Sequence, residues 1–234
     1  MNTVHLPPLF TAMLTAGADP FEAACTAARQ GCDAGLVTYD ISADRLRAAI
    51  VFAPEIALTH AMVMQPICGI GFQNALGTLA PPEVSVHLEW GGALRVNGAK
   101  CGTLKTAAHP ADPAQVPNWL VVGLDLTLWA DTQDTGLTPD VTSLYAEGCS
   151  DVPAGDLLEA WVRHTLSWIN RWDEDGVQPV HSEWTGLAHG ISDNVTVNGL
   201  TGTFRGIDET FGLLLQPDGP AQIIPLTHTL KDVS

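Results

Sequence analysis

The stretch that most constrains the fold runs from Val84 to Lys105 and predicts a strand followed by a β-hairpin. Residues 84–90 alternate apolar and polar side chains, which is the pattern of a half-buried strand. Asn97-Gly98 then supplies the two positive-φ positions of a type I′ turn, the strongest short-range signal for a hairpin. The turn therefore predicts paired strands at 93–96 and from 99 to about 107.

Between the first strand and the hairpin lie a tryptophan and two glycines, Trp90, Gly91 and Gly92. Because glycines carry no Cβ, a flat ligand can approach the backbone closely beside the indole. Glu89, which precedes them, suits a cationic or hydroxyl-bearing ligand and is equally compatible with an exposed strand position. The hairpin is therefore the first candidate for a binding site.

Two of the three lysines of the chain, Lys100 and Lys105, lie on the return strand. On an unbroken strand they point to opposite faces of the sheet, so only one of them is expected to face a site. A surface position is the alternative for each. Asp125 interrupts the apolar run at 119–128, which predicts a central strand. Because a buried Asp needs partners, it is either a structural hydrogen-bond acceptor or a ligand contact.

The segments before the hairpin predict two helices and a strand pair. Residues 1–16 predict an irregular lead-in, and Asp19 and Pro20 are the N-cap and first residue of a helix. Two strands joined by the short link 40–44 predict an antiparallel pair. A long helix is expected at 59–79, where Pro66 either kinks it or marks a late start.

The segments after the hairpin predict a second helix and a small β domain. Residues 153–175 place apolar and aromatic side chains at helical spacing. From Glu183 onward short strands alternate with turn signals, which predicts a small SH3-like barrel. The chain is therefore expected to divide into two domains, 1–182 and 183–234.

The charge of the chain excludes some classes of partner. Its 10 Lys and Arg against 26 Asp and Glu give a formal net charge of −16. Nucleic acids and anionic membrane surfaces are bound through cations, so neither is an expected partner. The most apolar window, 61–80, contains polar residues and Pro66, which predicts a core helix and not a membrane span. Five scattered cysteines without a C-x-x-C pair predict free thiols in the cytoplasm and no structural metal.

The order of these elements and several motifs resembles the biotin/lipoate protein ligase family. The resemblance covers nearly the whole chain. It is carried by Glu89–Ala93, Lys100–Leu104, Val122–Leu126, Gly202–Asp208 and Phe211–Leu215. The first three segments are similar to the family's Lys-Trp-Pro-Asn-Asp, Lys-x-x-Gly-Ile-Leu and Gly-x-Gly-Ile-Asn motifs, and the last two to the small barrel of biotin protein ligases.

The resemblance implies an α+β fold of the class II synthetase-like type, with a mixed sheet flanked by helices and a C-terminal SH3-like barrel. Family members join biotin or lipoate to AMP and pass the acyl group to a lysine of a carrier domain. The implied ligands are therefore ATP, biotin or lipoate/octanoate, and the acyl-adenylate. The implied partners are a small carboxylic acid and a carrier-domain protein. The implied catalytic residue is Lys100, and the ligand-binding residues are Glu89, Trp90, Gly91, Gly92, Gly102, Asp125 and Arg205.

The sequence departs from the family where phosphate charge must be stabilised. Glu89 replaces the motif lysine, and only 40–44 remains where the family has a loop that folds over the adenylate. Lys100 matches the motif only with a one-residue gap, and no nearby arginine cluster is expected to replace the missing cations. One hypothesis is a ligase-like enzyme with a remodelled site, whose activity is altered or absent. The other is a non-catalytic member that binds a small molecule or a partner protein.

Overall fold

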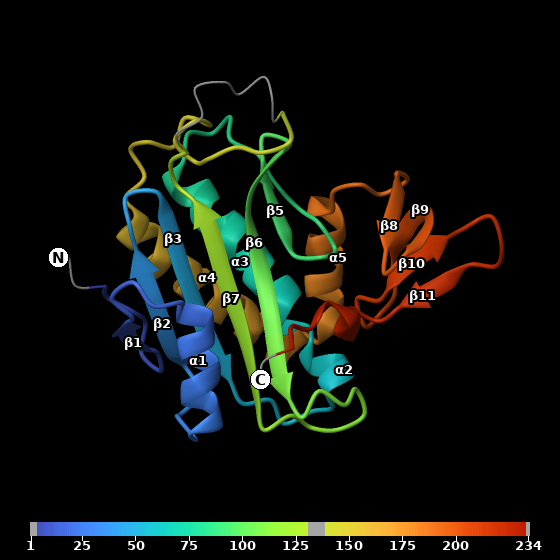
Figure 1. The fold of residues 1–234 in the computed structure, drawn as a ribbon, viewed down its shortest axis with the longest axis horizontal. Helices are drawn as coiled ribbons and strands as arrows, with labels where there is room; N and C mark the ends of the chain where they lie inside the picture. The colour runs from blue at the N-terminus through green and yellow to red at the C-terminus, as the bar shows by residue number, and fades with distance from the viewer. Residues whose placement is uncertain (1–3, 131–138, 233–234) are drawn as a thin grey trace.

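The computed structural model describes residues 4–130 and 139–232 of the chain. Eleven strands and six helices lie in these ranges (Figure 1). In chain order they are β1 (Thr11–Leu14), α1 (Pro20–Arg29), β2 (Leu36–Ile41), β3 (Arg45–Phe52), α2 (Leu58–Ala61), α3 (Met64–Leu79), β4 (Val86–Leu88), β5 (Ala93–Val96), β6 (Ala99–His109), β7 (Trp119–Thr127), α4 (Ala154–Asp175), α5 (Val177–Leu187), β8 (Asn194–Val197), β9 (Leu200–Ile207), β10 (Leu213–Gln216), β11 (Gln222–Ile224) and the 3-10 helix η2 (Leu226–Thr229).

The larger part of the molecule is a seven-stranded mixed sheet in the order β1-β2-β3-β7-β6-β5-β4. Only the β1–β2 pair is parallel. Helices α3 and α4 pack on one face, and α1 packs over β2, β3 and β7 on the other (Figure 1). We call the face that carries α1 the open face, because α1 is the only described helix on it. It presents Arg45, Arg47, Lys105, Gly123 and Asp125.

The main core lies between the sheet and the pair α3–α4. Helix α3 is buried on most sides, and α4 turns one stripe, which includes Trp161 and Thr165, towards it. The backbones approach so closely that a Cβ at Gly71 would lie 2.6 Å from the Thr165 hydroxyl oxygen. Small residues in α3 therefore set the distance between the two helices.

The C-terminal part is a four-stranded antiparallel sheet in the order β11-β10-β9-β8. It is consistent with the expected SH3-like barrel. Its inner residues, such as Phe204 and Leu213, belong to the same hydrophobic cluster as the main core. The division predicted between residues 182 and 183 falls inside α5, and the second sheet begins only at Asn194. We propose that the two parts meet between α5 and β8.

The expected helices, hairpin and strand pair are present, with three differences. The lead-in predicted as irregular contains β1, whose four residues are all exposed and therefore show no alternation of buried and exposed positions. Helix α5 was not predicted. The long helix is divided in two, and α3 begins at Met64, so Pro66 lies in its first turn and marks a late start. Within 4–130 and 139–232, no helix is long and apolar enough to cross a membrane.

Candidate functional site

The N-terminal end of α1 lies against the open face. The Asp19 carboxylate accepts hydrogen bonds from the backbone N–H groups of Phe21 (2.8 Å) and Glu22 (3.4 Å), as expected of the N-cap. The Thr38 hydroxyl of β2 donates to the Pro20 carbonyl at 2.7 Å. These bonds fix the first turn of α1 above β7.

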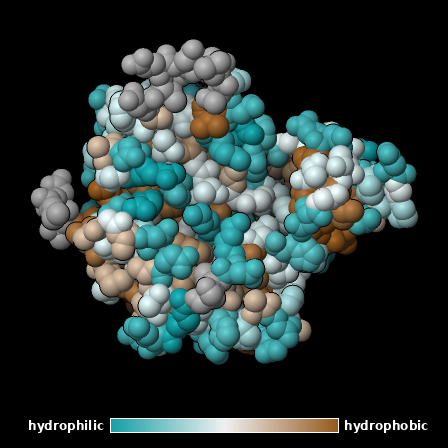
Figure 2. Space-filling view, in the orientation of Figure 1, coloured by the Kyte–Doolittle hydropathy of each residue, from teal (hydrophilic) through white to brown (hydrophobic). Residues whose placement is uncertain are grey.

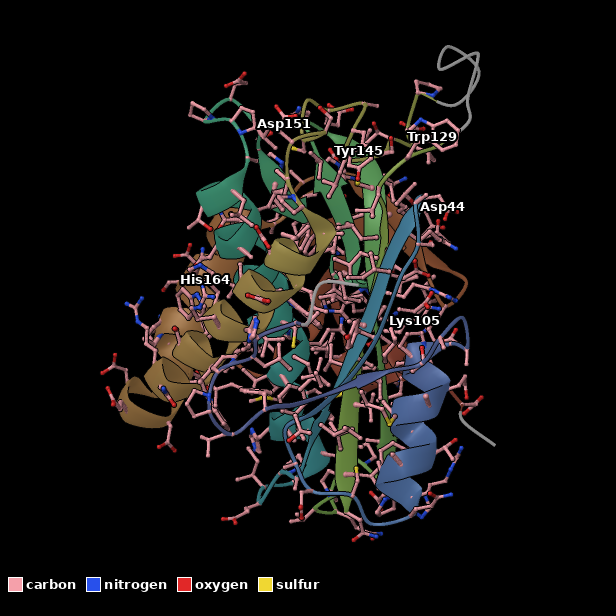
Figure 3. All side chains as sticks on the ribbon, turned by 90° about the vertical axis from the view of Figure 1, so that its left-hand side faces the viewer. Asp44, Lys105, Trp129, Tyr145, Asp151 and His164 are labelled. Carbon is pink, nitrogen blue, oxygen red and sulfur yellow. The ribbon has the colours of Figure 1, made fainter. Side chains whose placement is uncertain are left out.

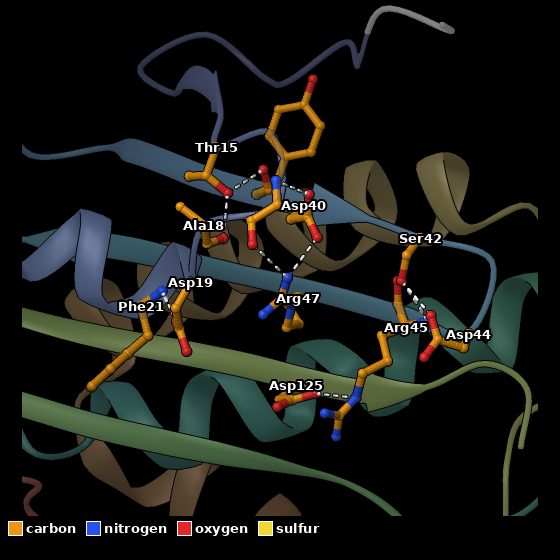
Figure 4. A network of polar contacts seen from close by, with 12 residues as sticks. Thr15, Ala18, Asp19, Phe21, Asp40, Ser42, Asp44, Arg45, Arg47 and Asp125 are labelled. Atoms are coloured by element: carbon orange, nitrogen blue, oxygen red, sulfur yellow. Dashed lines mark hydrogen bonds and ion pairs between the residues drawn. The ribbon is translucent and has the colours of Figure 1, made fainter.

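Charged side chains gather beside this turn (Figure 4). Arg47 of β3 donates to Asp40 of β2 at 2.7 Å, and Gly17 N–H donates to the same carboxylate at 2.8 Å. The hydrogen bond from Arg47 holds the pKa of Asp40 below its usual range, and Asp40 raises the pKa of Arg47. On the neighbouring strand pair, Arg45 Nε lies 3.3 Å from Asp125 Oδ1. Each arginine of β3 is therefore matched with an acid.

One donor in this group still lacks a partner. Arg47 Nε is buried and has no hydrogen-bond partner among the described residues, whereas Asp125 Oδ1, which also lacks a hydrogen bond there, lies 3.3 Å from Arg45 Nε in an ion pair. Lys105 of β6 lies opposite Gly123 of β7 and makes no ion pair in the described part of the chain. Buried polar atoms normally find partners, so this unused capacity marks a place for a polar ligand or a water molecule.

These residues line one small cavity of about 10 Å³ together with Asp19, Pro20 and Phe21. A space of this size holds roughly one water molecule. The cavity is small because the Phe21 ring covers Gly123. A Cβ at Gly123 would lie 2.6 Å from Phe21 Cδ2. The enclosed space therefore fits a single polar atom, such as one carboxylate oxygen, and the rest of any ligand would lie outside it on the open face.

The wider open face carries five of the ten Lys and Arg residues of an acidic chain, namely Arg45, Arg47, Arg95, Lys100 and Lys105. Hydrophilic residues cover the middle of this face (Figure 2). Figure 3 shows Lys105 on the same side of the sheet as α1, with His164 on the other. Beside Asp125, β3 supplies two arginines that the sequence analysis did not identify as site residues.

The expectation that Lys100 and Lys105 point to opposite faces is also wrong. The β5–β6 register shifts between Leu94 and Arg95, so the strand is interrupted by a bulge. Lys100 pairs with Arg95, which alternates with the buried Leu94 and Val96, and Lys100 therefore also faces away from the main core. It is exposed and does not line the cavity beside α1.

The aromatic residue of the hairpin has a partner inside the chain. Trp90 is 7% exposed, and its indole N–H donates to the Phe211 carbonyl at 2.7 Å. It thus joins the main sheet to the C-terminal part. Glu89 accepts a hydrogen bond from Arg95 Nε at 2.5 Å, so its charge is matched within the chain.

The glycines of the hairpin region allow backbone segments to approach one another. Gly92 has φ +93°, its carbonyl accepts from Leu104 N–H at 2.6 Å, and a Cβ there would lie 2.5 Å from the Leu104 carbonyl oxygen. A Cβ at Gly102 would lie 2.6 Å from the Asp125 carbonyl oxygen on β7. Gly91 is exposed with open space around it. Two of the three glycines are thus explained by strand packing.

The predicted site residues therefore separate into two places. Glu89, Trp90 and Gly91 line a groove of about 590 Å³ between the hairpin and the C-terminal sheet, whereas Asp125 lines the cavity beside α1. Arg205 is exposed on β9, next to the buried Phe204. No group of three or more His, Cys, Asp or Glu within residues 4–130 and 139–232 is arranged to hold a metal ion.

Sequence reasoning missed Arg45, Arg47 and Phe21 as site residues, and it ranked Lys105 below Lys100. One signal was present. Arg45 and Arg47 are two positions apart on a strand, so they share one face, and the rest of that strand is apolar. Their position next to Asp125 depends on the pairing of β3 with β7, which no local pattern reveals.

The mixed sheet with helices on both faces and a small C-terminal antiparallel sheet has the fold of biotin protein ligases. A biotin protein ligase from Aquifex aeolicus superposes with a TM-score of 0.73 at 13% identity, covering 92% of this chain and 95% of that one. The chain belongs to the Biotin/lipoate A/B protein ligase family, whose sequence model matches residues 6–186. Residues 191–232 match a domain of unknown function (DUF4444).

Three further matches are informative. A crystal structure described as a biotin protein ligase-like protein of unknown function, from Silicibacter sp., is 57% identical with a TM-score of 0.93, covering 98% of this chain and all of that one. A biotin--[acetyl-CoA-carboxylase] ligase of Paracoccus denitrificans is 22% identical over 182 residues, 75% of each chain. Another Aquifex aeolicus structure, at 13% identity and a TM-score of 0.70, is a complex with biotin and ATP and covers 92% of this chain and 95% of that one.

Proposed function

We propose that the protein binds a small carboxylic acid, or its acyl-adenylate, on the open face beside α1, and that its biotin/lipoate-type ligase activity is altered or absent. The observation that carries this proposal is that Arg47 and Lys105 line one cavity with Asp125, which Arg45 neutralises, and that the buried Arg47 Nε–H has no hydrogen-bond partner among the described residues. Such cations bind a carboxylate through charge-assisted hydrogen bonds.

The roles follow from the contacts. Lys105 is free of ion pairs among the described residues, so its ammonium is available to a carboxylate. Arg47 offers the Nε–H that has no hydrogen-bond partner in residues 4–130 and 139–232, while its Nη2 is held by Asp40. Asp125 holds Arg45 at the edge of the site. Arginine held in place by an acid loses less side-chain entropy when it binds an anion.

Two observations support altered or absent ligase activity. Only Ser42 to Asp44 connect β2 with β3, which is too short a link to fold over an adenylate. Glu89, which stands where the family motif has a lysine, is paired with Arg95 and supplies no cation.

The second candidate is an active enzyme that joins a short acid to AMP and transfers it to a carrier-domain lysine. It is favoured by the cations of the open face, since adenylation develops negative charge that needs such groups. Lys100 remains the candidate catalytic residue for this function because it lies on the same face. In the non-catalytic alternative, the same face binds the acid or a partner without using ATP.

The test is ATP–pyrophosphate isotope exchange with purified protein, supplied in turn with biotin, lipoate, octanoate, acetate and propionate. Thermal melting with each acid is measured in parallel. We expect the short acids to raise the melting temperature and biotin to give no exchange. Exchange with a short acid supports the active enzyme, and a thermal shift without exchange supports the binding protein. Exchange with biotin at the rate of a ligase, or no shift with any acid, would contradict the proposal.

A further inference from the structure

We propose that Phe21 determines specificity at this site, because its ring fills the space that the apolar tail of a longer acid would need. The ligand class is then carboxylic acids of a few carbon atoms. This inference rests on the proposed function, since it assumes that a carboxylate binds beside Lys105 and Arg47.

The Phe21 ring lies directly on the backbone of β7. An ideal Cβ at Gly123 would be 2.6 Å from Cδ2, 3.3 Å from Cγ and 3.4 Å from Cβ of Phe21. No side chain separates the ring from the sheet at this position. The missing side chain of Gly123 therefore leaves a recess in the open face, and the Phe21 ring occupies this recess.

The recess continues across the neighbouring strands. Ala49 of β3 and Lys105 of β6 are the two residues opposite Gly123 in the sheet register. Ala107 lies two positions further along β6 in the same buried cluster as Phe21. Around the ring the floor thus includes the small residues Gly123, Ala49 and Ala107, with Lys105 lining the adjoining cavity. An acid held by Lys105 would direct its tail into this floor, where the ring now lies.

The ring is held firmly in the recess. Phe21 is 7% exposed and is the second residue of α1, directly after Pro20. The Asp19 cap and the bond from Thr38 to the Pro20 carbonyl fix the turn that carries it. Opening the recess therefore requires breaking a helix cap, so the ring excludes longer ligands in the ground state.

Removing the ring should create a cavity on the order of 100 Å³, a size at which an apolar cavity stays dry and binds small hydrocarbons. This cavity would join the existing space beside Arg47, Lys105 and Asp125. In the wild-type protein we expect binding of propionate and no binding of octanoate. In Phe21→Ala we expect octanoate to bind at least about tenfold more tightly than in wild type, a gain of about 1.4 kcal/mol.

The measurement is isothermal titration calorimetry of the full chain with propionate and with octanoate. Val121→Ala is the matched control, because it enlarges the same buried cluster two positions along β7 without lining the cavity. It should leave octanoate binding as in wild type. The double variant Phe21→Ala/Lys105→Met should lose the gain, because the carboxylate has lost its cation.

The outcomes separate the two proposals. If wild type binds propionate and folded Phe21→Ala gains no octanoate binding, the role of Phe21 is wrong and the proposed function stands. If wild type binds neither acid but Phe21→Ala binds octanoate, Phe21 is the barrier and the short-acid function is wrong. An equal gain in Val121→Ala overturns the role of Phe21. If Phe21→Ala does not fold, Phe21→Val replaces it, and the absence of a gain there overturns the proposal equally.

Discussion

The hairpin around Trp90 and the region beneath the start of α1 contain similar residues but use them differently. In the hairpin region, the Trp90 indole N–H donates a hydrogen bond to the Phe211 carbonyl, and Glu89 accepts one from Arg95. Beneath α1, Arg47 Nε lacks a hydrogen bond and Lys105 lacks an ion pair among the described residues. Glu89 and Trp90 thus have partners within the chain, although His87 Nδ1 on the adjoining strand β4 is also buried without a hydrogen-bond partner among the described residues. Beneath α1 the groups without partners in the described ranges include those of two cationic side chains, Arg47 and Lys105.

The comparison shows which polar residues deserve a functional hypothesis. A tryptophan, a glutamate and glycines look like a site when their partners are unknown, yet each can be explained by a contact that the fold supplies. What remains after those contacts are counted is the capacity available to a ligand. By this criterion, the region beneath α1 is the better candidate.

The largest effect is expected from Trp90→Ala. This change removes a buried indole that joins the two parts of the molecule and leaves the Phe211 carbonyl without its donor. It should lower the free energy of unfolding by about 3–5 kcal/mol in urea titrations. Trp129 is 49% exposed and serves as the control. Trp129→Ala should change the free energy of unfolding by less than about 0.5 kcal/mol. If both variants lowered the free energy of unfolding by the same small amount, Trp90 would not stabilise the fold as proposed.

The second prediction concerns Gly123→Ala. The added methyl group meets the Phe21 ring, so overpacking should lower the free energy of unfolding by roughly 1–3 kcal/mol. In a Phe21→Leu background the cost should be smaller, because the ring is gone. A double-mutant cycle measured by chemical denaturation tests this coupling. Strictly additive effects would show that Phe21 does not lie on Gly123 in solution.

The third prediction compares the two lysines. Lys105→Met should weaken propionate binding about tenfold, or about 1.4 kcal/mol, because it removes the cation beside Arg47. Lys100→Met should change it less than about twofold, since Lys100 does not line the cavity. Isothermal titration calorimetry of both variants gives their dissociation constants for propionate and hence the ratio of the two losses. A larger loss in Lys100→Met would move the site towards the hairpin.

The smallest effect concerns pH. Because Arg47 lowers the pKa of Asp40 in the folded state, the ionised carboxylate stabilises the protein above the unfolded pKa of about 4. This stability is lost as pH falls through the lower, folded pKa. Wild type should exceed Asp40→Asn in unfolding free energy by about 1 kcal/mol at pH 7. The difference should shrink steadily below pH 4, and a difference that grew on acidification would contradict the assigned direction.

Much of the fold could be predicted because its signals are local. The turn at Asn97-Gly98 has φ of +49° and +91°, as the sequence required, and Asp19 caps α1. The elements that were missed lack such signals. Strand β1 is an exposed edge, and the bulge at Cys101 alters the faces of β6 beside Gly102, a glycine that the motif match explained in another way.

The site was less predictable because it depends on distant pairings. Asp125 was identified from its interruption of an apolar strand, which is a local feature. Its neighbour Arg45 is 80 residues away in sequence (125 − 45) and reaches it only through the β3–β7 register. In the same way, Trp90 could be recognised as structural only once its hydrogen-bond partner on the distant Phe211 was known.

The most direct test of the account is an NMR titration of ¹⁵N-labelled protein with propionate. The account predicts chemical-shift changes centred on the amides of Lys105, Gly123 and Asp125, with the Trp90 indole N–H and the Gly91 amide unchanged. Changes centred on Trp90 and Gly91, with Lys105 and Gly123 unaffected, would place the ligand in the groove beside the hairpin and contradict it.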